Sequence, residues 1–389
     1  MSELDSIKKH VEHLSVTIGP RGSTKSGEIK AADYIEKVYR DFGLDPIIEP
    51  FTSAKSAWYP YALASGLVLL SEILYLFGYG YLSIILSIFA LVSLVLELMF
   101  KSNPFRWILP TEESQNVSVR LEPTEEIKEK LVLIGHMDTH RTPIIYKSQR
   151  WIKGFSYLTT ITFVSAIIIL SIYILDFFID TILLPLLSFA FSIPVLILYG
   201  IALSADRTEY TNGANDNATG TAMVIGLVER ILKNPLQHTE VWGVNSGCEE
   251  VGAYGAADWV KHHIPEVQGG IYITLDNLGG KGCGPCFISK ETLIFPFESD
   301  KNLLELANRI AEENPDLGAY SRQMRGAYTD GAIGAIGGLR CLTFVNYTPD
   351  GVIPDWHQLS DVYENVDWDT VQRTQEFVWK LIQMIDRKA

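Results

Sequence analysis

The stretch from Glu129 to Asp138, EKLVLIGHMD, decides the fold class. Its centre is a continuous apolar run, which is typical of a strand buried on both faces of a parallel or mixed sheet. Helical patterns separate it from three later runs of the same kind: TEVWGVN at 239–245, GGIYITLDN at 269–277 and GLRCLTFVN at 338–346. The alternation predicts an α/β fold, a three-layer αβα arrangement around a mixed, mostly parallel central sheet.

The composition excludes some classes of function. The chain has 389 residues, 47% of them hydrophobic, so it can bury a large core in one large domain or in two to three smaller ones. A formal net charge of -14 leaves no basic stripe that could neutralise phosphates. We therefore expect no nucleic-acid partner, and the acidity suits a site that collects cations.

The four cysteines do not indicate a disulfide scaffold, because they are too few for a chain of this size. Cys283-Gly-Pro-Cys286 has the spacing of a thioredoxin-type redox pair, which requires a helix N-terminus to stabilise a thiolate. The residues that follow, from Phe287 to Ser289, read as a strand. We therefore expect an ordinary loop at this pair, with redox chemistry as the alternative.

Four long apolar segments interrupt the soluble sequence, and each is long enough to cross a bilayer, which takes ~20 residues. They form two pairs, which we predict to be transmembrane hairpins at 58–100 and 151–204 and together a four-helix transmembrane bundle. The alternative is two hairpins buried in a large core or a dimer interface, but long helices without a polar face are rare in soluble folds. The segments are Tyr61 to Phe77, Tyr81 to Phe100, Phe155 to Leu175 and Thr181 to Ala202, and the short turn from Asp176 to Asp180 joins the last two.

The distribution of charge predicts the orientation of the hairpins. Lys and Arg lie next to the outer ends of both hairpins, whereas neither hairpin turn contains one. The positive-inside rule then predicts that the soluble segments 1–57, 101–150 and 205–389 share the cytosolic side and assemble into one domain. For Glu72, inside the first hairpin, we expect a structural hydrogen bond or a protonated acid, with a transport or substrate role as the alternative.

Polar residues cluster where the predicted strands end. Taken singly, each has a plain structural explanation, such as a surface turn, an Asx turn before a helix, or acids at a helix N-terminus. Together they are candidate metal ligands, because ligands converge at the carboxyl ends of strands in open α/β sheets. Their carboxylate and imidazole groups suit zinc, and manganese or cobalt would also be accepted. The candidates are His136, Asp138, Asp216, Glu249, Glu250, Asp276 and His357.

In order and spacing these residues resemble the M28 metallopeptidase family of dizinc aminopeptidases and related carboxypeptidases. The resemblance covers essentially all the soluble sequence, although the interval between His136 and Asp216 is much longer than is usual in the family. The second predicted hairpin accounts for the excess. The motifs that carry the resemblance are GHMD at 135–138, NGANDNATGTAM at 212–223, CEEVGAYGA at 248–256, LDNLGG at 275–280, AYTDG at 327–331 and HQLSDVYENV at 357–366.

The resemblance implies a zinc-aminopeptidase-like fold and a role for each candidate. Asp216 would bridge two zinc ions, His136 and Asp276 would complete one site, and Glu250 and His357 would complete the other. A water shared by the two ions would become hydroxide near neutral pH, because zinc lowers the pKa of its water toward ~7. The catalytic residues would be Glu249, as general base, and Asp138, which would orient His136. Tyr328 would help to hold the substrate carbonyl oxygen.

The sequence thus predicts a membrane-anchored dizinc metallopeptidase, most simply an aminopeptidase that releases N-terminal residues from peptides. Its expected partners are a peptide substrate and the lipid bilayer, and an oligomer would be compatible with the sequence. Two alternatives remain. One is a zinc acyl transferase of the glutaminyl-cyclase type, which shares the scaffold and uses a single zinc ion. The other is a catalytically inactive peptidase-like receptor or scaffold.

Overall fold

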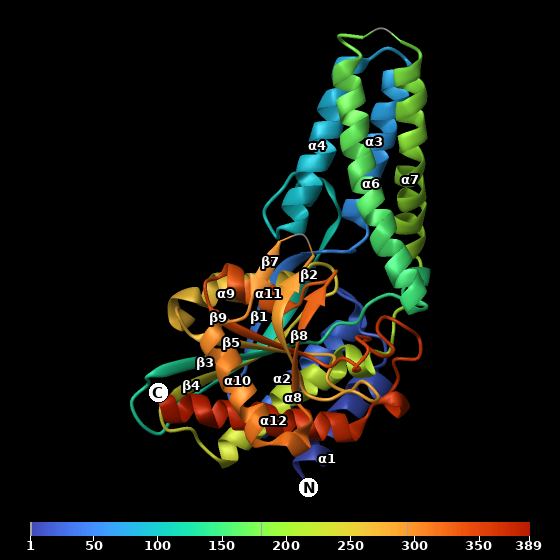
Figure 1. The fold of residues 1–389 in the computed structure, drawn as a ribbon. Helices are drawn as coiled ribbons and strands as arrows, with labels where there is room; N and C mark the ends of the chain where they lie inside the picture. Colours follow the sequence, from blue (N-terminus) through green and yellow to red (C-terminus); the bar gives the residue numbers. More distant parts are fainter. Residues whose placement is uncertain (1, 180, 294) are drawn as a thin grey trace. The chain divides into compact units, whose positions relative to one another are not determined.

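The computed structural model describes residues 2–179, 181–293 and 295–389 (Figure 1). The chain divides into two compact units, each made of separate segments. We call Met1–Lys55, Glu112–Arg141 and Tyr210–Ala389 the α/β unit, and Ser56–Thr111 and Thr142–Glu209 the helical unit. Asp180, the end of the turn predicted from Asp176 to Asp180, lies outside the described residues.

The α/β unit contains one sheet, whose strands are β1 (Ile47–Ala54), β2 (Thr111–Leu121), β3 (Glu129–His136), β4 (Thr239–Ser246), β5 (Ile271–Asp276), β6 (Cys286–Thr292), β7 (Pro296–Glu298), β8 (Tyr320–Arg325) and β9 (Arg340–Val345). Among the described residues the strand order is β1-β2-β4-β3-β5-β9-β6-β7, and β8 pairs with β6. The central strands β4, β3, β5 and β9 are parallel, whereas β2 and β6 pair antiparallel with β4 and β9. The predicted mixed, mostly parallel sheet is confirmed.

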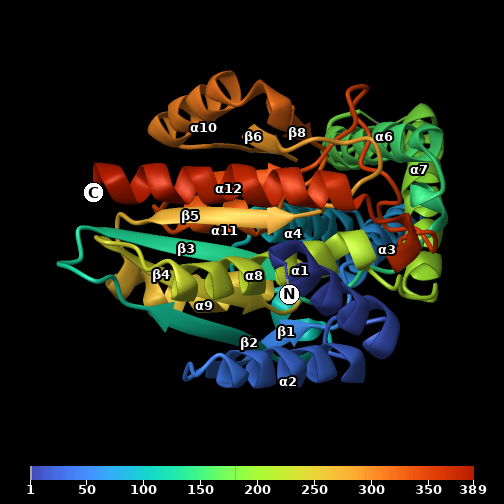
Figure 2. The ribbon, with the colours of Figure 1, turned by 90° about the horizontal axis from the view of Figure 1, so that it is seen from below.

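Helices cover both faces of this sheet (Figure 2). They are α1 (Glu3–Glu12), α2 (Ser26–Asp41), α8 (Gly220–Lys233), α9 (Tyr254–Val267), α10 (Lys301–Glu313), α11 (Asp330–Ile336) and α12 (Trp368–Lys388). Two neighbours on β4 mark the two faces. A side chain at Gly243 would meet Val228 of α8, whereas the ring of Trp242 packs 5.6 Å from that of Trp259 of α9. The alternation of side chains along a strand therefore places α8 and α9 in different layers.

The apolar run of β3 is buried, as the sequence predicts. Leu131, Val132, Leu133 and Ile134 of β3 are all fully buried, on both faces of the strand. Burying both faces leaves the two ends of the strand as the places where polar groups can meet solvent or a ligand. His136 is the last residue of β3.

The start of α8 approaches the sheet closely at Gly220. A Cβ built at this position would overlap the carbonyl oxygen of Leu275 in β5 and the side-chain amide of Asn217. Only a glycine lets the helix N-terminus lie this near to the strand. The close approach also brings the turn before α8 next to the ends of β3 and β5.

We expect Gly220→Ala to destabilise the α/β unit by about 1–3 kcal/mol, the usual range for overpacking of a tight contact. Urea unfolding of the detergent-purified protein measures this change. Gly200→Ala in the helical unit is the matched control, because no atom lies within 4 Å of an added Cβ there. An unfolding midpoint that is unchanged by Gly220→Ala would contradict the expectation.

The helical unit contains α3 (Tyr59–Leu76), α4 (Gly80–Leu98), α5 (Phe105–Ile108), α6 (Gln149–Leu175) and α7 (Leu183–Ala205). Among the described residues, α3, α4, α6 and α7 are long and apolar enough to cross a membrane, and Figure 1 shows them side by side. Helix α6 starts at Gln149, six residues before Phe155, where the predicted apolar segment begins. The polar residues before Phe155 are therefore helical as well. The membrane crossing, its orientation and the division into a soluble domain and two hairpins stay predictions.

Glu72 lies in a polar network at the centre of these helices. Its two carboxylate oxygens accept hydrogen bonds from the Tyr173 hydroxyl of α6 and the Ser188 hydroxyl of α7, both at 2.9 Å. The neighbouring Ser71 hydroxyl lies 2.8 Å from that of Ser87 in α4. All four long helices therefore contribute to the network. These contacts are the structural hydrogen bonds that we expected for an acid in an apolar bundle.

Candidate metal centre

The structure brings the five predicted ligand residues together at the carboxyl ends of the central strands. Two of them end β3 and β5, a third follows β4, a fourth lies in the turn Ala214–Thr219 before α8, and the fifth lies between β9 and α12. Parallel strands present their carboxyl ends at one edge, so the topology explains why distant segments meet there. The residues are His136, Asp276, Glu250, Asp216 and His357.

The two oxygens of Asp216 face two different clusters. Oδ1 lies 3.4 Å from Nε2 of His136, which in turn lies 3.5 Å from Oδ1 of Asp276. Oδ2 lies 3.2 Å from Nε2 of His357, which lies 3.3 Å from Oε2 of Glu250. Each cluster thus contains one imidazole, one carboxylate of its own and one oxygen of the shared Asp216.

The spacing of these donor atoms fits zinc. Around a tetrahedral zinc ion with bonds of ~2.0–2.1 Å, neighbouring donors lie about 3.3 Å apart. The four distances in the two clusters run from 3.2 to 3.5 Å. In addition, Oε1 of Glu250 is buried and accepts no hydrogen bond from the described residues. A buried carboxylate oxygen without a hydrogen bond is costly unless a cation is its partner.

The electrostatics of the centre favour bound cations. Burial lowers the pKa of the His357 imidazole, but Glu250 and Asp216 outweigh this effect and raise that pKa to about 9. Burial likewise opposes charging of His136, but its carboxylate neighbours, led by Asp138, raise its pKa well above the ordinary value. Burial also raises the pKa of Glu250 to about 7. Without a metal the centre therefore holds protons, which zinc would replace on binding.

Glu249 lies beside the two clusters of donor atoms but belongs to neither. Its side chain is 13% exposed, and Oε2 lies 4.0 Å from Nε2 of His136. Burial raises the pKa of Glu249 well above its ordinary value, and the neighbouring carboxylate of Glu250 raises it further, whereas His136 opposes the shift. A carboxylate with raised proton affinity next to a metal centre is suited to accept a proton at neutral pH.

Asp138 connects the first imidazole to the two glutamates. Its Oδ1 lies 3.3 Å from Nδ1 of His136 and accepts the backbone N–H of Glu249 at 3.0 Å. Its Oδ2 accepts the backbone N–H of Glu250 at 3.2 Å and the hydroxyl of Ser23 at 2.6 Å. These are the contacts of a group that orients the residues around it, which is the predicted role of Asp138.

Tyr328 has other partners in the structure. Its hydroxyl donates to the backbone oxygen of Phe295 at 3.0 Å and accepts the N–H of the same residue at 3.1 Å. Its ring packs edge-on against Phe297 of β7. These contacts do not support the predicted contact with a substrate carbonyl, and that role stays a prediction.

Two buried charged residues that sequence reasoning missed hold the centre in place. Arg21 is fully buried and donates from its guanidinium to backbone oxygens on both sides of the centre, including those of Met137 and Gly213, each at 2.8 Å. Asp361 accepts the backbone N–H of Asn215 at 2.6 Å and that of Asp216 at 3.0 Å. Asp361 lies inside the motif HQLSDVYENV, but neither this motif nor the residues around Arg21 indicate that these two side chains bind backbone groups far away in the chain.

We expect Asp361→Asn to weaken zinc binding about 10–100-fold, the usual cost of losing a group that orients a metal ligand. The amide keeps the size of the side chain but cannot accept both N–H groups with a carboxylate's strength. Competition with a chromophoric chelator measures the affinity. Asp386→Asn is the matched control, because Asp386 also accepts backbone N–H groups, from Gln237 to Thr239, at the opposite end of β4. Equal zinc affinity in the two variants would contradict the expectation.

Cys283 and Cys286 form no reactive site. Cys286 starts β6, so no helix N-terminus follows the pair, and both side chains are buried as free thiols. Burial raises the pKa of each thiol to about 12. A redox pair needs an accessible thiolate, so the expected ordinary loop is the better interpretation.

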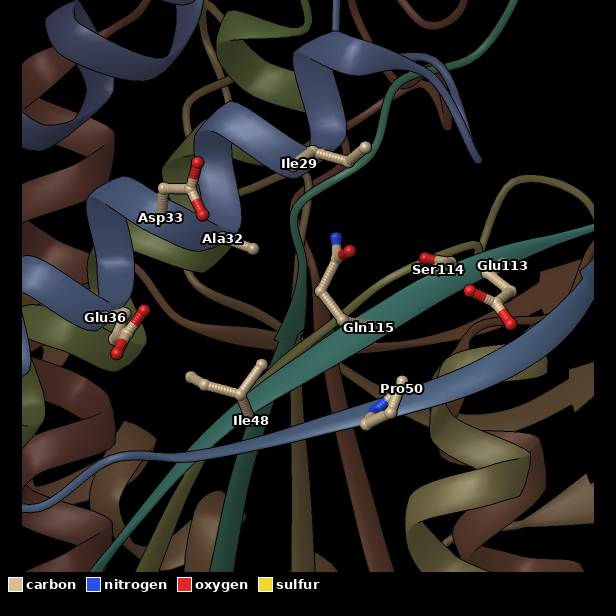
Figure 3. A pocket seen from close by; sticks show the side chains of 9 residues that line it. All are labelled: Ile29, Ala32, Asp33, Glu36, Ile48, Pro50, Glu113, Ser114 and Gln115. Atoms are coloured by element: carbon tan, nitrogen blue, oxygen red, sulfur yellow. The ribbon is translucent and has the colours of Figure 1, made fainter.

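A groove of about 330 Å³ lies elsewhere on the α/β unit, between α2 and the strands β1 and β2 (Figure 3). Its lining is part acidic and part apolar, and none of the predicted site residues belongs to it. The groove is therefore separate from the candidate metal centre. Its lining residues are Ile29, Ala32, Asp33, Glu36, Ile48, Pro50, Glu113, Ser114 and Gln115.

Comparison with solved structures identifies the class of fold. The chain is similar to a glutaminyl cyclase from Tannerella forsythia (15% identity, 98% of each chain covered, TM-score 0.59). It is also similar to BSAP, a zinc aminopeptidase from Bacillus subtilis (14% identity, 98% of this chain and 95% of that chain, TM-score 0.58), and to an aminopeptidase from Aneurinibacillus sp. strain AM-1 (13%, 97% and 93%, TM-score 0.58). The fold is thus one that zinc aminopeptidases and glutaminyl cyclases share.

The sequence of the second half matches a known family. Residues 201–382 match the model of Peptidase family M28. The match includes Asp216, Glu249 and His357, whereas His136 and Asp138 lie before it. No curated protein matches the sequence. The family and the similar structures suggest zinc as the metal of the centre.

Proposed function

We propose that this protein is a membrane-anchored zinc metallopeptidase that binds two zinc ions and acts as an aminopeptidase. The observation that supports it best is the position of Asp216, whose two oxygens lie 3.4 and 3.2 Å from imidazole nitrogens of separate clusters. One carboxylate shared in this way suits a pair of metal ions. The long apolar helices α3, α4, α6 and α7 support the anchor.

Each residue near the centre has a task in peptide hydrolysis. Bound zinc supplies Lewis acidity, which lowers the pKa of a water and polarises the amide carbonyl. Glu249 accepts the proton of the attacking water and delivers it to the leaving amine. Asp138 holds the backbone of Glu249 and Glu250, so that the base keeps its distance from the ligands. Burial raises the proton affinity of Glu249, so that it can accept the proton from water and later deliver it to the amine.

The two alternatives differ from this proposal in testable ways. A transferase of the glutaminyl-cyclase type uses one zinc ion, and the cluster of His136 and Asp276 supplies a second set of donors that it would not need. An inactive receptor or scaffold would have no use for Glu249 beside an intact donor set. Both features favour the peptidase.

The decisive experiment compares three peptide sets with the detergent-purified protein: free N-termini, N-acetylated N-termini, and N-terminal glutamine. Mass spectrometry should show stepwise loss of residues from peptides with a free α-amino group and no loss from N-acetylated peptides. Glu249→Gln should lower the rate about 10²–10⁴-fold, the usual contribution of a general base, and should leave the zinc content unchanged. Glu240→Gln is the matched control, because this buried glutamate of β4 pairs with Arg120 outside the centre.

Other outcomes would point to the alternatives. Cyclisation of N-terminal glutamine with release of ammonia, without hydrolysis, would identify the transferase. Absence of any reaction in zinc-loaded protein would favour the scaffold. Removal of zinc by a chelator should abolish hydrolysis, and added zinc should restore it, which excludes a contaminating metal-independent peptidase.

We propose that the domain matched at residues 201–382 lies on the cytosolic side, because Lys and Arg cluster at the outer ends of the apolar helices. A reporter fused to the C-terminus tests this orientation in cells. An enzyme reporter that is active only outside the cytosol would contradict it.

A further inference from the structure

His140 lies against the metal centre although neither the sequence motifs nor the proposed mechanism uses it. It follows His136 and Asp138 in the segment after β3, at the same two-residue spacing. Its side chain is buried, and its ring stacks on that of His357 with 3.7 Å between the centroids and 13° between the planes. The stacked partner is one of the five candidate zinc ligands.

His357 is a candidate ligand that no helix or strand positions. It lies in a turn between β9 and α12, and its backbone has a positive φ of 55°. No regular element therefore fixes the direction of its side chain. The ring of Trp356 lies 4.5 Å away at 37°, so the imidazole is in contact with two aromatic rings. Of the two contacts only the stack on His140 is nearly parallel, and a flat stack restricts rotation of the His357 ring about its last side-chain bond.

The ring of His140 is itself fixed to the backbone. Its Nδ1 lies 2.5 Å from the backbone oxygen of Arg141, so Nδ1 carries the proton and donates it there. Arg141 forms a β-bridge with Tyr210, which anchors this backbone to the segment before Asp216. The ring of His140 is thus a rigid surface for its neighbour.

Direct ligation of zinc by His140 is the competing role. One of its ring nitrogens lies within 4.8 Å of ligand atoms of Glu250 and His357. However, the lone pair of an imidazole nitrogen lies in the plane of its ring. Two nearly parallel rings therefore direct their lone pairs along separate planes, which do not converge on one ion. The stacked geometry favours orientation of His357 over ligation.

We propose that His140 is a positioning residue, whose flat ring holds the imidazole of His357 in the plane required for zinc. The inference rests on the proposed role of His357 as a ligand. In this role the face of the His140 ring is needed, and its ring nitrogens are not. A residue with a flat ring but no nitrogen should therefore support zinc binding equally well at this position.

Two substitutions separate the ring from the nitrogens. His140→Phe keeps a flat ring, His140→Leu keeps bulk without one, and both remove the hydrogen bond to Arg141. We expect zinc affinity, measured by chelator competition, to fall about 10–100-fold in the Leu variant, as for other groups that orient a ligand. The Phe variant should stay within about threefold of the wild type. His263→Phe is the control, because His263 is also buried and stacks on an aromatic ring, that of Trp259, outside the centre.

The same measurements can overturn the proposal. Equal losses in the Phe and Leu variants, with one zinc ion missing in each by elemental analysis, would identify His140 as a ligand. Unchanged affinity in both would show that the stack has no role. The melting temperature of the zinc-free proteins separates general destabilisation from loss of affinity, and His140→Met replaces the Leu variant if that does not fold. Wild-type protein that binds no zinc would refute the proposed function instead.

Discussion

The candidate metal centre depends on one carboxylate, that of Asp216, which presents each of its oxygens to an imidazole from a different segment. A side chain with this task cannot rotate freely, so the backbone beneath it has to be held. Asp361 accepts the N–H of Asp216 and of the residue before it. Arg21 holds the backbone oxygens of Asn212 and Gly213, just upstream. Both charges are buried, so hydrogen bonds take the place of water around them.

The organisation of the chain leaves this arrangement intact. The helical unit is inserted at two points, between β1 and β2 and after the segment that follows β3. Neither insertion interrupts a strand of the sheet. Long insertions in connections cost little, since the entropy of closing a loop grows slowly with its length. The second insertion separates His136 from Asp216 in sequence, but the parallel sheet and α8 still bring them within 3.4 Å.

The central strands β3, β4, β5 and β9 could be predicted from the sequence, because their apolar runs are local patterns. The five candidate ligands were selected from the predicted strand ends and from the resemblance to the M28 family, and their roles stay predictions. The apolar run from Leu131 to Ile134 predicts a fully buried strand whatever packs against it. The strand ends then locate His136 and Asp276. Arg21 and Asp361 could not be predicted, since their partners are backbone groups that carry no residue-specific signal. The hydroxyl of Tyr328 donates to the backbone oxygen of Phe295, a contact that the motif around Tyr328 did not indicate, and its predicted role toward a substrate stays a prediction.

By itself, the sequence determined the α/β class, four helices apolar enough to cross a membrane, and the residue types suited to zinc. These follow from hydrophobic periodicity and from the chemistry of single side chains, which need no knowledge of distant neighbours. Only the tertiary structure decided that the oxygens of Asp216 divide between two clusters, that Asp138 holds the backbone of Glu249, and that His140 stacks on His357. Such contacts join segments far apart in the chain, and their distances and ring angles exist only once the sheet has brought those segments together.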